Sequence, residues 1–472
     1  MTCSGLPHGN SSGINSFGMT ILPEATDMPG PGRRQVLAGG GAFLAAPFIS
    51  RPARAADRDV VIIGAGAAGL AAARALSRRG LSVALIEASG RIGGRAHTES
   101  ATFGVPFDQG CTFLHNARRN PFVKYARASG FAISSLPPDD ATKVYTGAHE
   151  ASAAQYRAMD RRYRAVHAAL LGAGREGRDI SMGAAIAQLG RSRWQPLAGF
   201  WHSLATGQEL EDVSVVDWWN AADGKDYHCR AGYGALVAHF GRGLPVHLST
   251  RAREINWSGS GVKVVTNKGT LRARAAIVTV SLGVLAAEAI RFVPPLPVWK
   301  QRAIDGFAMG SYVTIGLQFK QQRVLPVPDN AWFWIDGRPD ELLEFMSNMG
   351  GWGVSRANAA GHLGLELEGA GRKEAVDFAL SRLKSALGPR ITRLFARGSF
   401  TGWTGNPLTF GTWAMARPGH AGARKLLAEP VGKRIFLAGE ACHEDMFATC
   451  HGALLSGQTT ARHVAHLLKN PL

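Results

Sequence analysis

The sequence predicts an α/β protein, in which a strand, a glycine-rich turn, a helix and a second strand follow one another. A β-branched run at 59–63 leads straight into the hexapeptide GAGAAG at 64–69, and an Ala/Leu-rich stretch continues to about residue 79. A second apolar run at 81–86 ends in Glu87. Length and periodicity make the two runs strands and the stretch between them a helix. This order is typical of a Rossmann-type unit, which binds a dinucleotide.

Each residue type at the turn has a physical task. Gly64 permits the tight turn, Gly66 lets the backbone approach a pyrophosphate at the helix amino terminus, and Gly69 lets the helix lie close to the strand. Ala68, in the same turn, is also expected at the cofactor. Glu87 stands 18 residues after the last glycine. An acid at this place accepts hydrogen bonds from ribose hydroxyls and repels the 2′-phosphate of NADP.

Composition limits the class of protein. The chain has 472 residues, 46% of them hydrophobic and 19% charged, so it can bury real cores and is not globally disordered. A net charge of +18 could indicate nucleic acid as a partner. The basic residues are scattered, however, and no zinc-finger or RNP-like motif is present, so we expect no nucleic acid. The five cysteines lack the spacing of a zinc site, so we expect no metal.

The amino terminus has the pattern of an export signal. Residues 32–37 read GRRQVL, a 14-residue apolar stretch follows at 36–49, and Ala53-Arg54-Ala55 forms a small-x-small cleavage signature. We therefore predict a twin-arginine signal peptide over 1–55 and a periplasmic protein exported in the folded state. The apolar stretch is too short for a comfortable membrane span, so no stable membrane anchor is expected. A start at Met28 would give the signal a more usual length.

Three further segments carry a resemblance to a known family. Residues 91–95 read RIGGR, residues 281–285 read SLGVL at the end of an apolar run, and residues 434–457 read RIFLAGEACHEDMFATCHGALLSG. With the glycine turn, they resemble the FAD-containing amine oxidases, among them polyamine and monoamine oxidases. The resemblance covers nearly all of the chain after residue 57, and the second glycine pair favours FAD over NAD.

The resemblance implies a discontinuous Rossmann-type FAD-binding domain and an inserted α+β substrate-binding domain. The first is expected at 57–115, 226–290 and 396–472, and the second at 116–225 and 291–395. Alternating apolar residues and turn signals at 245–280 indicate a β-meander in the first domain. A helical pattern at 156–171 in the second domain would help to enclose a substrate channel.

The resemblance also implies how FAD is held. Thr412 stands where monoamine oxidases carry the cysteine that is linked to the flavin, so FAD should be bound non-covalently. Glu440 belongs to the Gly-Glu pair that contacts the ribityl and pyrophosphate region. The resemblance also places six further residues at the cofactor: Gly94, Arg95, Gly110, Ala252, Cys450 and His451.

Four residues are expected at the substrate. Trp413 matches one wall of the aromatic cage that flanks the substrate nitrogen in this family. Thr449 occupies the place of the second wall, so the cage is predicted to be half-built. His115, in a segment that resembles the polyamine oxidase "LGATWIHG", would face the substrate channel. Thr314 stands where many amine oxidases carry a lysine that holds a water beside the flavin.

These residues predict oxidation of an amine. A hydride would pass from the α carbon to flavin N5, and water would hydrolyse the resulting imine. Because a net charge of +18 repels polycations, a polyamine is disfavoured, and amino acids or heterocyclic amines remain open. Acids at the channel could reverse that field locally, and His443, Glu444 and Asp445 are candidates for attracting a cationic amine near the mouth.

Three alternatives stay open. Thr314 offers no fixed positive charge to help dioxygen react, so an amine dehydrogenase that reduces a periplasmic cytochrome is the first. The electron acceptor is therefore either dioxygen or a periplasmic protein. A carotenoid-desaturase-like FAD oxidoreductase that acts on carbon is the second. The third is a catalytically silent flavoprotein.

Overall fold

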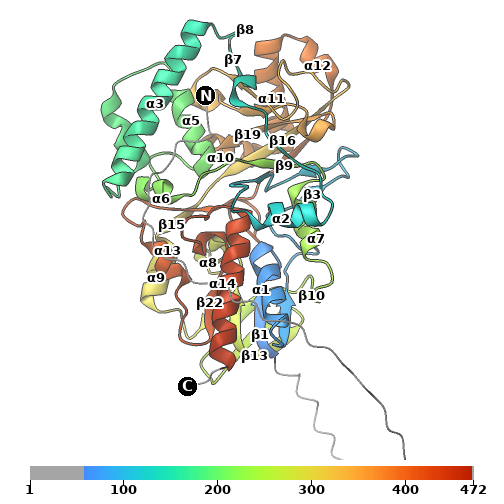
Figure 1. Ribbon diagram of the computed structural model, residues 1–472, viewed down its shortest axis with the longest axis vertical. Helices are drawn as coiled ribbons and strands as arrows, with labels where there is room; N and C mark the ends of the chain where they lie inside the picture. Colours follow the sequence, from blue (N-terminus) through green and yellow to red (C-terminus); the bar gives the residue numbers. More distant parts are fainter. Residues whose placement is uncertain (1–57, 470–472) are drawn as a thin grey trace, which may run out of the picture. The chain divides into compact units, whose positions relative to one another are not determined.

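The computed structural model describes residues 58–469, and the predicted signal peptide at 1–55 lies outside the described residues. Two large sheets, one of eight strands and one of seven, organise the described chain. Figure 1 shows the first with α1 and α14 below and the second with α10–α12 above. Helices pack against both sheets, so the predicted α/β class is confirmed.

The eight-stranded sheet contains the predicted glycine turn. Five of its strands run parallel, in the order β10-β2-β1-β13-β22, while β12 and β11 continue it as an antiparallel meander within the predicted range 245–280. Strand β14 then pairs with β11. The strands are β1 (Arg58–Ile63), β2 (Val83–Ile86), β10 (Val246–His247), β11 (Ala252–Asn256), β12 (Val262–Thr266), β13 (Gly269–Val278), β14 (Arg291–Val293) and β22 (Ile435–Leu437).

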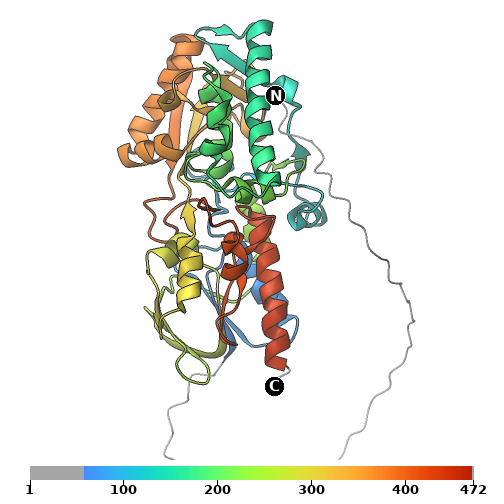
Figure 2. The ribbon, with the colours of Figure 1, turned by 90° about the vertical axis from the view of Figure 1, so that its left-hand side faces the viewer.

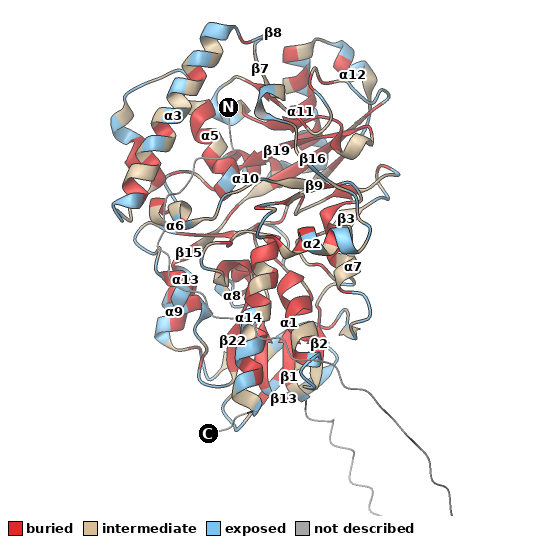
Figure 3. Cartoon of the chain, viewed as in Figure 1, coloured by how far each residue is buried: buried red, intermediate tan, exposed pale blue. Residues whose placement is uncertain are grey.

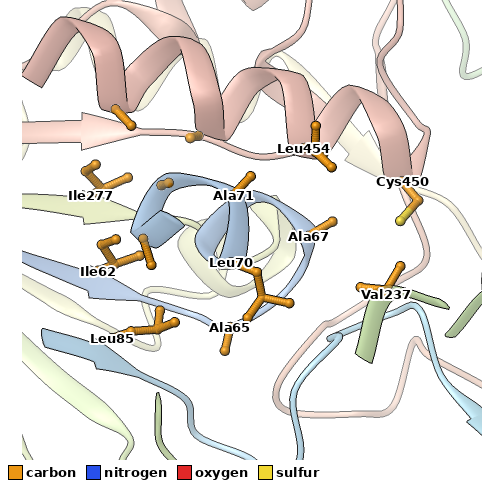
Figure 4. Close-up of a cluster of buried hydrophobic side chains, with 14 of the residues drawn as sticks. Ile62, Ala65, Ala67, Leu70, Ala71, Leu85, Val237, Ile277, Cys450 and Leu454 are labelled. Atoms are coloured by element: carbon orange, nitrogen blue, oxygen red, sulfur yellow. The ribbon is translucent and has the colours of Figure 1, made fainter. Parts of the chain in front are cut away.

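Two helices from opposite ends of the chain pack together on this sheet. Helix α1 (Ala67–Ser77) follows the glycine turn, and α14 (Cys450–Lys469) lies beside it. A Cβ added at Gly457 would collide with the carbonyl oxygen of Ala68, so the two helices touch through their backbones. Small residues such as Ala71 and larger ones such as Leu454 and Ile62 fill the space between helices and sheet (Figure 4).

The seven-stranded sheet has one apolar face and one face with both apolar and polar side chains. Its order is β20-β16-β19-β18-β17-β7-β8. Because side chains alternate along a strand, Val313, Ile315 and Ala357 pack with α11 on one face, and Thr314 and Arg356 point to the other. The strands are β7 (Lys143–Thr146), β8 (His149–Glu150), β16 (Tyr312–Phe319), β17 (Trp332–Ile335), β18 (Glu344–Met346), β19 (Val354–Ala360) and β20 (Phe395–Thr401).

Helices cover both faces of this second sheet. Figure 2 shows α11 (Arg372–Leu387) and α12 (Arg390–Leu394) on the left, and α3 (Ala153–Arg175) and α5 (Gln195–Thr206) on the right. Figure 3 shows that the strands are mostly buried and that outward faces of helices such as α3 are exposed. The other helices are α2 (Pro121–Ala128), α4 (Met182–Ile186), α6 (Val215–Asn220), α7 (Tyr233–Phe240), α8 (Leu282–Ala286), α9 (Val298–Asp305), α10 (Gly361–Ala370) and α13 (Ala423–Ala428).

Small sheets and short elements complete the described chain. The strands β5 and β6 flank β9, β3 pairs with β4, and β15 pairs with β21. Their bounds are β3 (Thr98–Glu99), β4 (Phe107–Asp108), β5 (Phe113–Leu114), β6 (Ile133–Ser135), β9 (Tyr227–Cys229), β15 (Phe307–Met309) and β21 (Ala414–Ala416). The limits of the two domains remain a prediction. Strand β14 pairs in the first sheet although it begins at residue 291, and β20 pairs in the second sheet although it continues to residue 401.

Candidate active site

The glycine-rich turn has the geometry that its sequence predicts. Gly64 has a φ of +103°, which favours glycine. A Cβ added at Gly69 would collide with the carbonyl oxygen of Gly64. Helix α1 can therefore lie this close to β1 only because Gly69 has no side chain. Thr279 Oγ1 donates to the carbonyl oxygens of Ile63 and Gly64 at 2.9 and 3.0 Å. The turn is thus fixed from β13, through a residue that the sequence motif does not include.

Glu87 is buried at the end of β2 and holds the turn from the other side. Its Oε2 accepts from the backbone N–H of Ala65 at 2.7 Å, and its Oε1 accepts from the N–H of Ser89 at 2.8 Å. Carboxylate oxygens can accept further bonds, so the acid can still bind ribose hydroxyls. The N–H of Thr250 donates to the carbonyl oxygen of Glu87 at 2.7 Å. This bond places the predicted residue Ala252, two positions further on, close to the same loop.

The second glycine pair lies against the first turn. The N–H of Gly93 donates to the carbonyl oxygen of Ala65 at 2.9 Å, and Gly94 has a φ of +58°. A Cβ at Gly94 would lie 3.3 Å from the Cα of Gly66. The two glycine segments therefore form one bare stretch of backbone, the surface that a pyrophosphate approaches. Ala68, by contrast, turns its backbone toward α14.

Arg95 connects the amino-terminal and carboxyl-terminal parts of the predicted cofactor site. Its Nη1 donates to the carbonyl oxygen of Thr412 and lies 3.1 Å from Oε1 of Glu440, which is buried. The other carboxylate oxygen of Glu440 accepts from the backbone N–H of Ala448 at 3.2 Å. A Cβ added at Gly110 would collide with the carbonyl oxygen of Arg95. Arg95, Gly110 and Glu440, predicted separately, are thus brought together.

The amino terminus of α14 carries three of the predicted residues. Thr449 caps this helix, because its Oγ1 accepts from the N–H of Gly452 at 3.0 Å. His451 is 1% exposed and its Nε2 lies 2.7 Å from the sulfur of Met446. Burial lowers the pKa of His451 to about 3, so this imidazole stays neutral at ordinary pH. Cys450 packs into the core of the first sheet.

Trp413 has an aromatic neighbour that the sequence did not identify. The ring centroid of Tyr312, on β16, lies 5.3 Å from that of Trp413 at an interplanar angle of 49°. Gly207 approaches the same indole, since a Cβ there would lie 3.2 Å from the ring. Within residues 58–469, the buried Nε1 of Trp413 has no hydrogen-bond partner.

Thr314 belongs to a buried polar network on the face of the second sheet that is opposite α11. Its Oγ1 accepts from Nη2 of Arg356 at 2.8 Å and donates to Oδ1 of Asn358 at 3.1 Å. The amide of Asn358 donates in turn to Oε2 of Glu344 at 2.6 Å. Thr314 itself is uncharged, as predicted, but the neighbouring strand brings a guanidinium to it. A fixed positive charge thus lies beside Thr314, although Thr314 itself carries none.

His115 forms an ion pair with Asp226. The pairing of β5 with β9 brings the two together, and Nδ1 of His115 lies 2.7 Å from Oδ2 of Asp226. Burial lowers the pKa of His115, but the charge of Asp226 outweighs that effect and the net shift is upward. The His115 side chain is 48% exposed. Its Nε2 can therefore meet a ligand while Asp226 fixes the ring.

The predicted acidic mouth is partly neutralised. Oδ2 of Asp445 lies 2.7 Å from Nη1 of Arg119, and Oδ1 lies 3.3 Å from Nδ1 of His443. Glu444 is exposed.

In the described part of the chain, no group of three or more His, Cys, Asp or Glu side chains could hold a metal ion. No helix between residues 58 and 469 is long and apolar enough to cross a membrane.

These features together define a class of protein. The bare glycine backbone, the buried Glu87 and the Arg95–Glu440 ion pair form a cradle for a dinucleotide at the carboxyl ends of parallel strands. The aromatic pair Tyr312–Trp413 lies next to this cradle, because Trp413 directly follows Thr412, whose carbonyl oxygen accepts from Arg95. This arrangement is that of a dinucleotide-binding oxidoreductase, and the second glycine pair suits FAD.

Comparison with known proteins gives the family. Residues 67–465 match the family model described as flavin containing amine oxidoreductase. Polyamine oxidase 4 of Oryza sativa subsp. japonica is 28% identical over 476 residues, which cover 89% of this chain and 91% of that protein. Lysine-specific histone demethylase 1 homolog 1 of the same plant is 29% identical over 457 residues, which cover 86% of this chain. The chain spans about half of that relative's length, 52%.

Solved structures agree with the fold. Cyclohexylamine oxidase from Brevibacterium oxydans superimposes with a TM-score of 0.75 at 21% identity, covering 88% of this chain and 100% of that one. A triple mutant of putrescine oxidase gives a TM-score of 0.74 at 18% identity, covering 87% of this chain and 99% of that one.

Because the family model matches residues 67–465, the chain belongs to the flavin-containing amine oxidoreductases, FAD-dependent enzymes that act on amines. The family match also confirms the cofactor predicted from the sequence, FAD.

Proposed function

We propose that this enzyme oxidises an amine at the carbon beside the nitrogen, and that water hydrolyses the resulting imine. The observation that carries the proposal is the pair of rings of Trp413 and Tyr312, 5.3 Å apart, next to the FAD cradle. Bound FAD would supply the acceptor for the hydride. Solved structures with this fold include a cyclohexylamine oxidase and a putrescine oxidase, and a relative in sequence is a polyamine oxidase.

The chain's own residues would bind and deprotonate the amine. The two aromatic side chains, with ring centroids 5.3 Å apart, offer apolar walls and π faces to the substrate nitrogen. Neutral His115 donates from Nδ1 to Asp226 and leaves Nε2 as an acceptor for a proton of the substrate ammonium. Thr449, which caps α14, would contribute to the shape of the site rather than form a second aromatic wall.

We propose dioxygen as the electron acceptor. The argument for slow reaction with dioxygen depended on the absence of a positive charge at Thr314. The guanidinium of Arg356, 2.8 Å from Thr314 Oγ1, supplies such a charge and can stabilise negative charge that develops on dioxygen. Transfer to a periplasmic cytochrome remains the alternative. No observation in the described residues favours a desaturase-like reaction on carbon.

An anaerobic substrate screen tests the proposed function. Purified holoenzyme is mixed with primary, secondary and cyclic amines, amino acids and polyamines without oxygen, and the visible absorbance of the flavin is followed. Bleaching with at least one amine, together with formation of the matching carbonyl product, is expected. Failure of every amine to bleach a flavin that dithionite does bleach would leave the silent flavoprotein as the better description.

We also propose export through the twin-arginine pathway. The support is the segment GRRQVL at 32–37 and the apolar stretch after it, both outside the described residues. Replacing Arg33 and Arg34 with lysines should leave FAD-loaded protein in the cytoplasm, because the pathway reads the arginine pair. Fractionation of cells that express the two forms decides this, with a periplasmic and a cytoplasmic marker enzyme as controls. Unchanged periplasmic recovery of the lysine form would contradict it.

A further inference from the structure

Arg356 is a buried cation whose hydrogen bonds all go to neutral oxygens. It is 3% exposed on β19. Nη1 donates to Thr112 Oγ1, Nη2 donates to Thr314 Oγ1 at 2.8 Å and to Asn358 Oδ1 at 3.0 Å, and Nε donates to the same Asn358 oxygen at 3.2 Å. Within residues 58–469, no carboxylate lies within ion-pair distance of it.

The other buried cations of the chain show what is missing here. Arg424, 4% exposed, binds both carboxylate oxygens of Asp217 at 2.7 Å. Lys300 lies at the carboxyl end of α13, where three backbone carbonyl oxygens accept from its Nζ. The negative end of the helix dipole stabilises its charge there. A buried charge without a counter-charge is costly. Arg356 therefore has neither the carboxylate that Arg424 binds nor the helix carboxyl terminus that holds Lys300.

Nearby acids of the chain are already engaged. Glu344 reaches Arg356 only through the amide of Asn358, and its own oxygens accept from Trp332 Nε1 at 3.0 Å and from Asn358 at 2.6 Å. Asp108 accepts from the backbone N–H groups of Tyr233 and Gly234. Burial raises the pKa of Asp108 to about 6, so it is largely ionised at neutral pH, but it lies outside ion-pair distance of Arg356.

The guanidinium can still receive an anion. It carries five N–H groups, and the four bonds above leave one N–H on Nη1 without an acceptor. Arg356 lines a hollow together with Asp108, Thr112, His228 and Arg230. Arg230 is exposed and lies over the ring of Trp352, with its Cζ 4.4 Å from the centroid. A second positive charge thus stands at the same hollow.

We propose that Arg356 binds an acidic group of the substrate, so that the substrate is an amine that carries a carboxylate, an amino acid, rather than a simple amine or a polyamine. This inference rests on the proposed function, whose amine would be oxidised beside the network that Arg356 and Thr314 share. A carboxylate would supply a counter-charge at ion-pair distance, which no acid within residues 58–469 provides. A net charge of +18 repels a polycation at long range but not a zwitterionic amino acid, which has no net charge.

Matched substrate pairs test the inference. Each amino acid is compared with the amine that lacks its carboxylate, phenylalanine with phenethylamine and lysine with cadaverine, by the second-order rate of anaerobic flavin reduction in the holoenzyme. We expect at least one amino acid to exceed its partner about tenfold or more in the wild type. Arg356→Gln should lower the amino-acid rate about 10- to 100-fold, the range of a lost charge-assisted bond. The amine rate should change far less.

Two controls separate charge from folding. Arg356→Lys keeps the charge and should recover part of the preference, while Arg164→Gln removes an arginine that is 76% exposed on α3 and should change neither rate. Thermal unfolding of each holoenzyme shows whether it is folded. A wild type that prefers the amines, or an equal loss of both rates in Arg356→Gln, would overturn the inference while leaving the proposed function intact.

Carboxylate binding is measured separately from turnover. Benzoate is titrated into the holoenzyme, and its dissociation constant is obtained from the shift in the flavin spectrum. Binding that weakens at least tenfold in Arg356→Gln supports the inference even if neither substrate pair reduces the flavin. Absence of binding to the wild type, or equal binding to wild type and Arg356→Gln, contradicts it.

Discussion

Nη1 of Arg95 lies 3.1 Å from Oε1 of Glu440, a pair separated by 345 positions in the chain. The ion pair joins the loop after the second glycine pair to the segment that precedes α14. The same guanidinium binds the carbonyl oxygen of Thr412, next to Trp413. One side chain thus connects the cofactor cradle with the aromatic pair where the substrate is expected.

Removing Glu440 should therefore weaken FAD binding. Glu440→Ala deletes the partner of Arg95 and the acceptor of the Ala448 N–H, and we expect the dissociation constant of FAD to rise about 10- to 100-fold. The ratio of FAD to protein after gel filtration measures this, and Glu440→Gln should show a smaller loss. Glu176→Ala, at a surface acid that is 62% exposed, is the matched control. Full FAD occupancy in Glu440→Ala would refute the role given to the ion pair.

FAD should separate from the denatured protein. Thr412 directs its hydroxyl to the carbonyl oxygen of Gly310 at 2.8 Å and has no thiol with which to form a bond to the flavin. Precipitation with trichloroacetic acid should therefore leave all of the FAD in the supernatant, where absorbance and chromatography identify it. Flavin retained in the washed pellet would mean that another residue is linked to it.

The ion pair of His115 with Asp226 predicts a pH dependence. Because the pKa of His115 is raised, the imidazole becomes a proton acceptor only above its usual range, and kcat/KM should rise with pH through that raised pKa. Asp226→Asn removes the charge that raises it, so the rising limb should move to lower pH. Asp160→Asn, on the surface of α3, should leave the profile unchanged. A limb that stays in place in Asp226→Asn would assign it to another group.

Trp413 should matter more for catalysis than for stability. Its ring is only partly buried and is positioned by Tyr312 and Gly207. Trp413→Ala should slow flavin reduction about 100-fold, the effect of a misplaced substrate, and cost less than the roughly 3–5 kcal/mol of a core tryptophan. Trp257→Ala, at a partly buried tryptophan in the first sheet, should lower stability without changing the rate. Proportionate losses in Trp413→Ala would make it a packing residue.

The cofactor cradle was predictable because its signals are local. Gly64, Gly69 and Glu87 lie within 24 residues of one another, and each is required by a turn, a close contact or a ribose. Arg95 and Glu440 were found through segment resemblance, but nothing in their spacing predicts that they form a pair. That contact depends on the parallel packing of β1, β13 and β22, which is a tertiary property.

Asp226, Tyr312 and Arg356 escaped prediction for a different reason. The chain has 53 Lys and Arg residues, so one more arginine gives no signal by itself. Thr314, which accepts a hydrogen bond from Arg356, lies on the adjacent strand 42 positions away in the chain. A usable signal does exist in β19, VSRANAA, where an arginine and an asparagine alternate with small residues in a strand that is buried throughout. Polar side chains on one face of a buried strand indicate a site facing that side.

The last prediction concerns the electron acceptor, and it follows from the bond between Arg356 and Thr314. A fixed positive charge beside the reacting centre stabilises negative charge on dioxygen without reorganisation. We therefore expect the reduced enzyme to react quickly with dioxygen in a stopped-flow experiment and slowly with cytochrome c. Arg356→Gln should slow reoxidation at least tenfold, whereas Thr314→Ser, which keeps the hydroxyl, should not. Slow reoxidation of the wild type, with fast reduction of cytochrome c, would instead establish a dehydrogenase. Because this measurement begins with dithionite-reduced enzyme, its outcome does not depend on which amine, or amino acid, the enzyme oxidises.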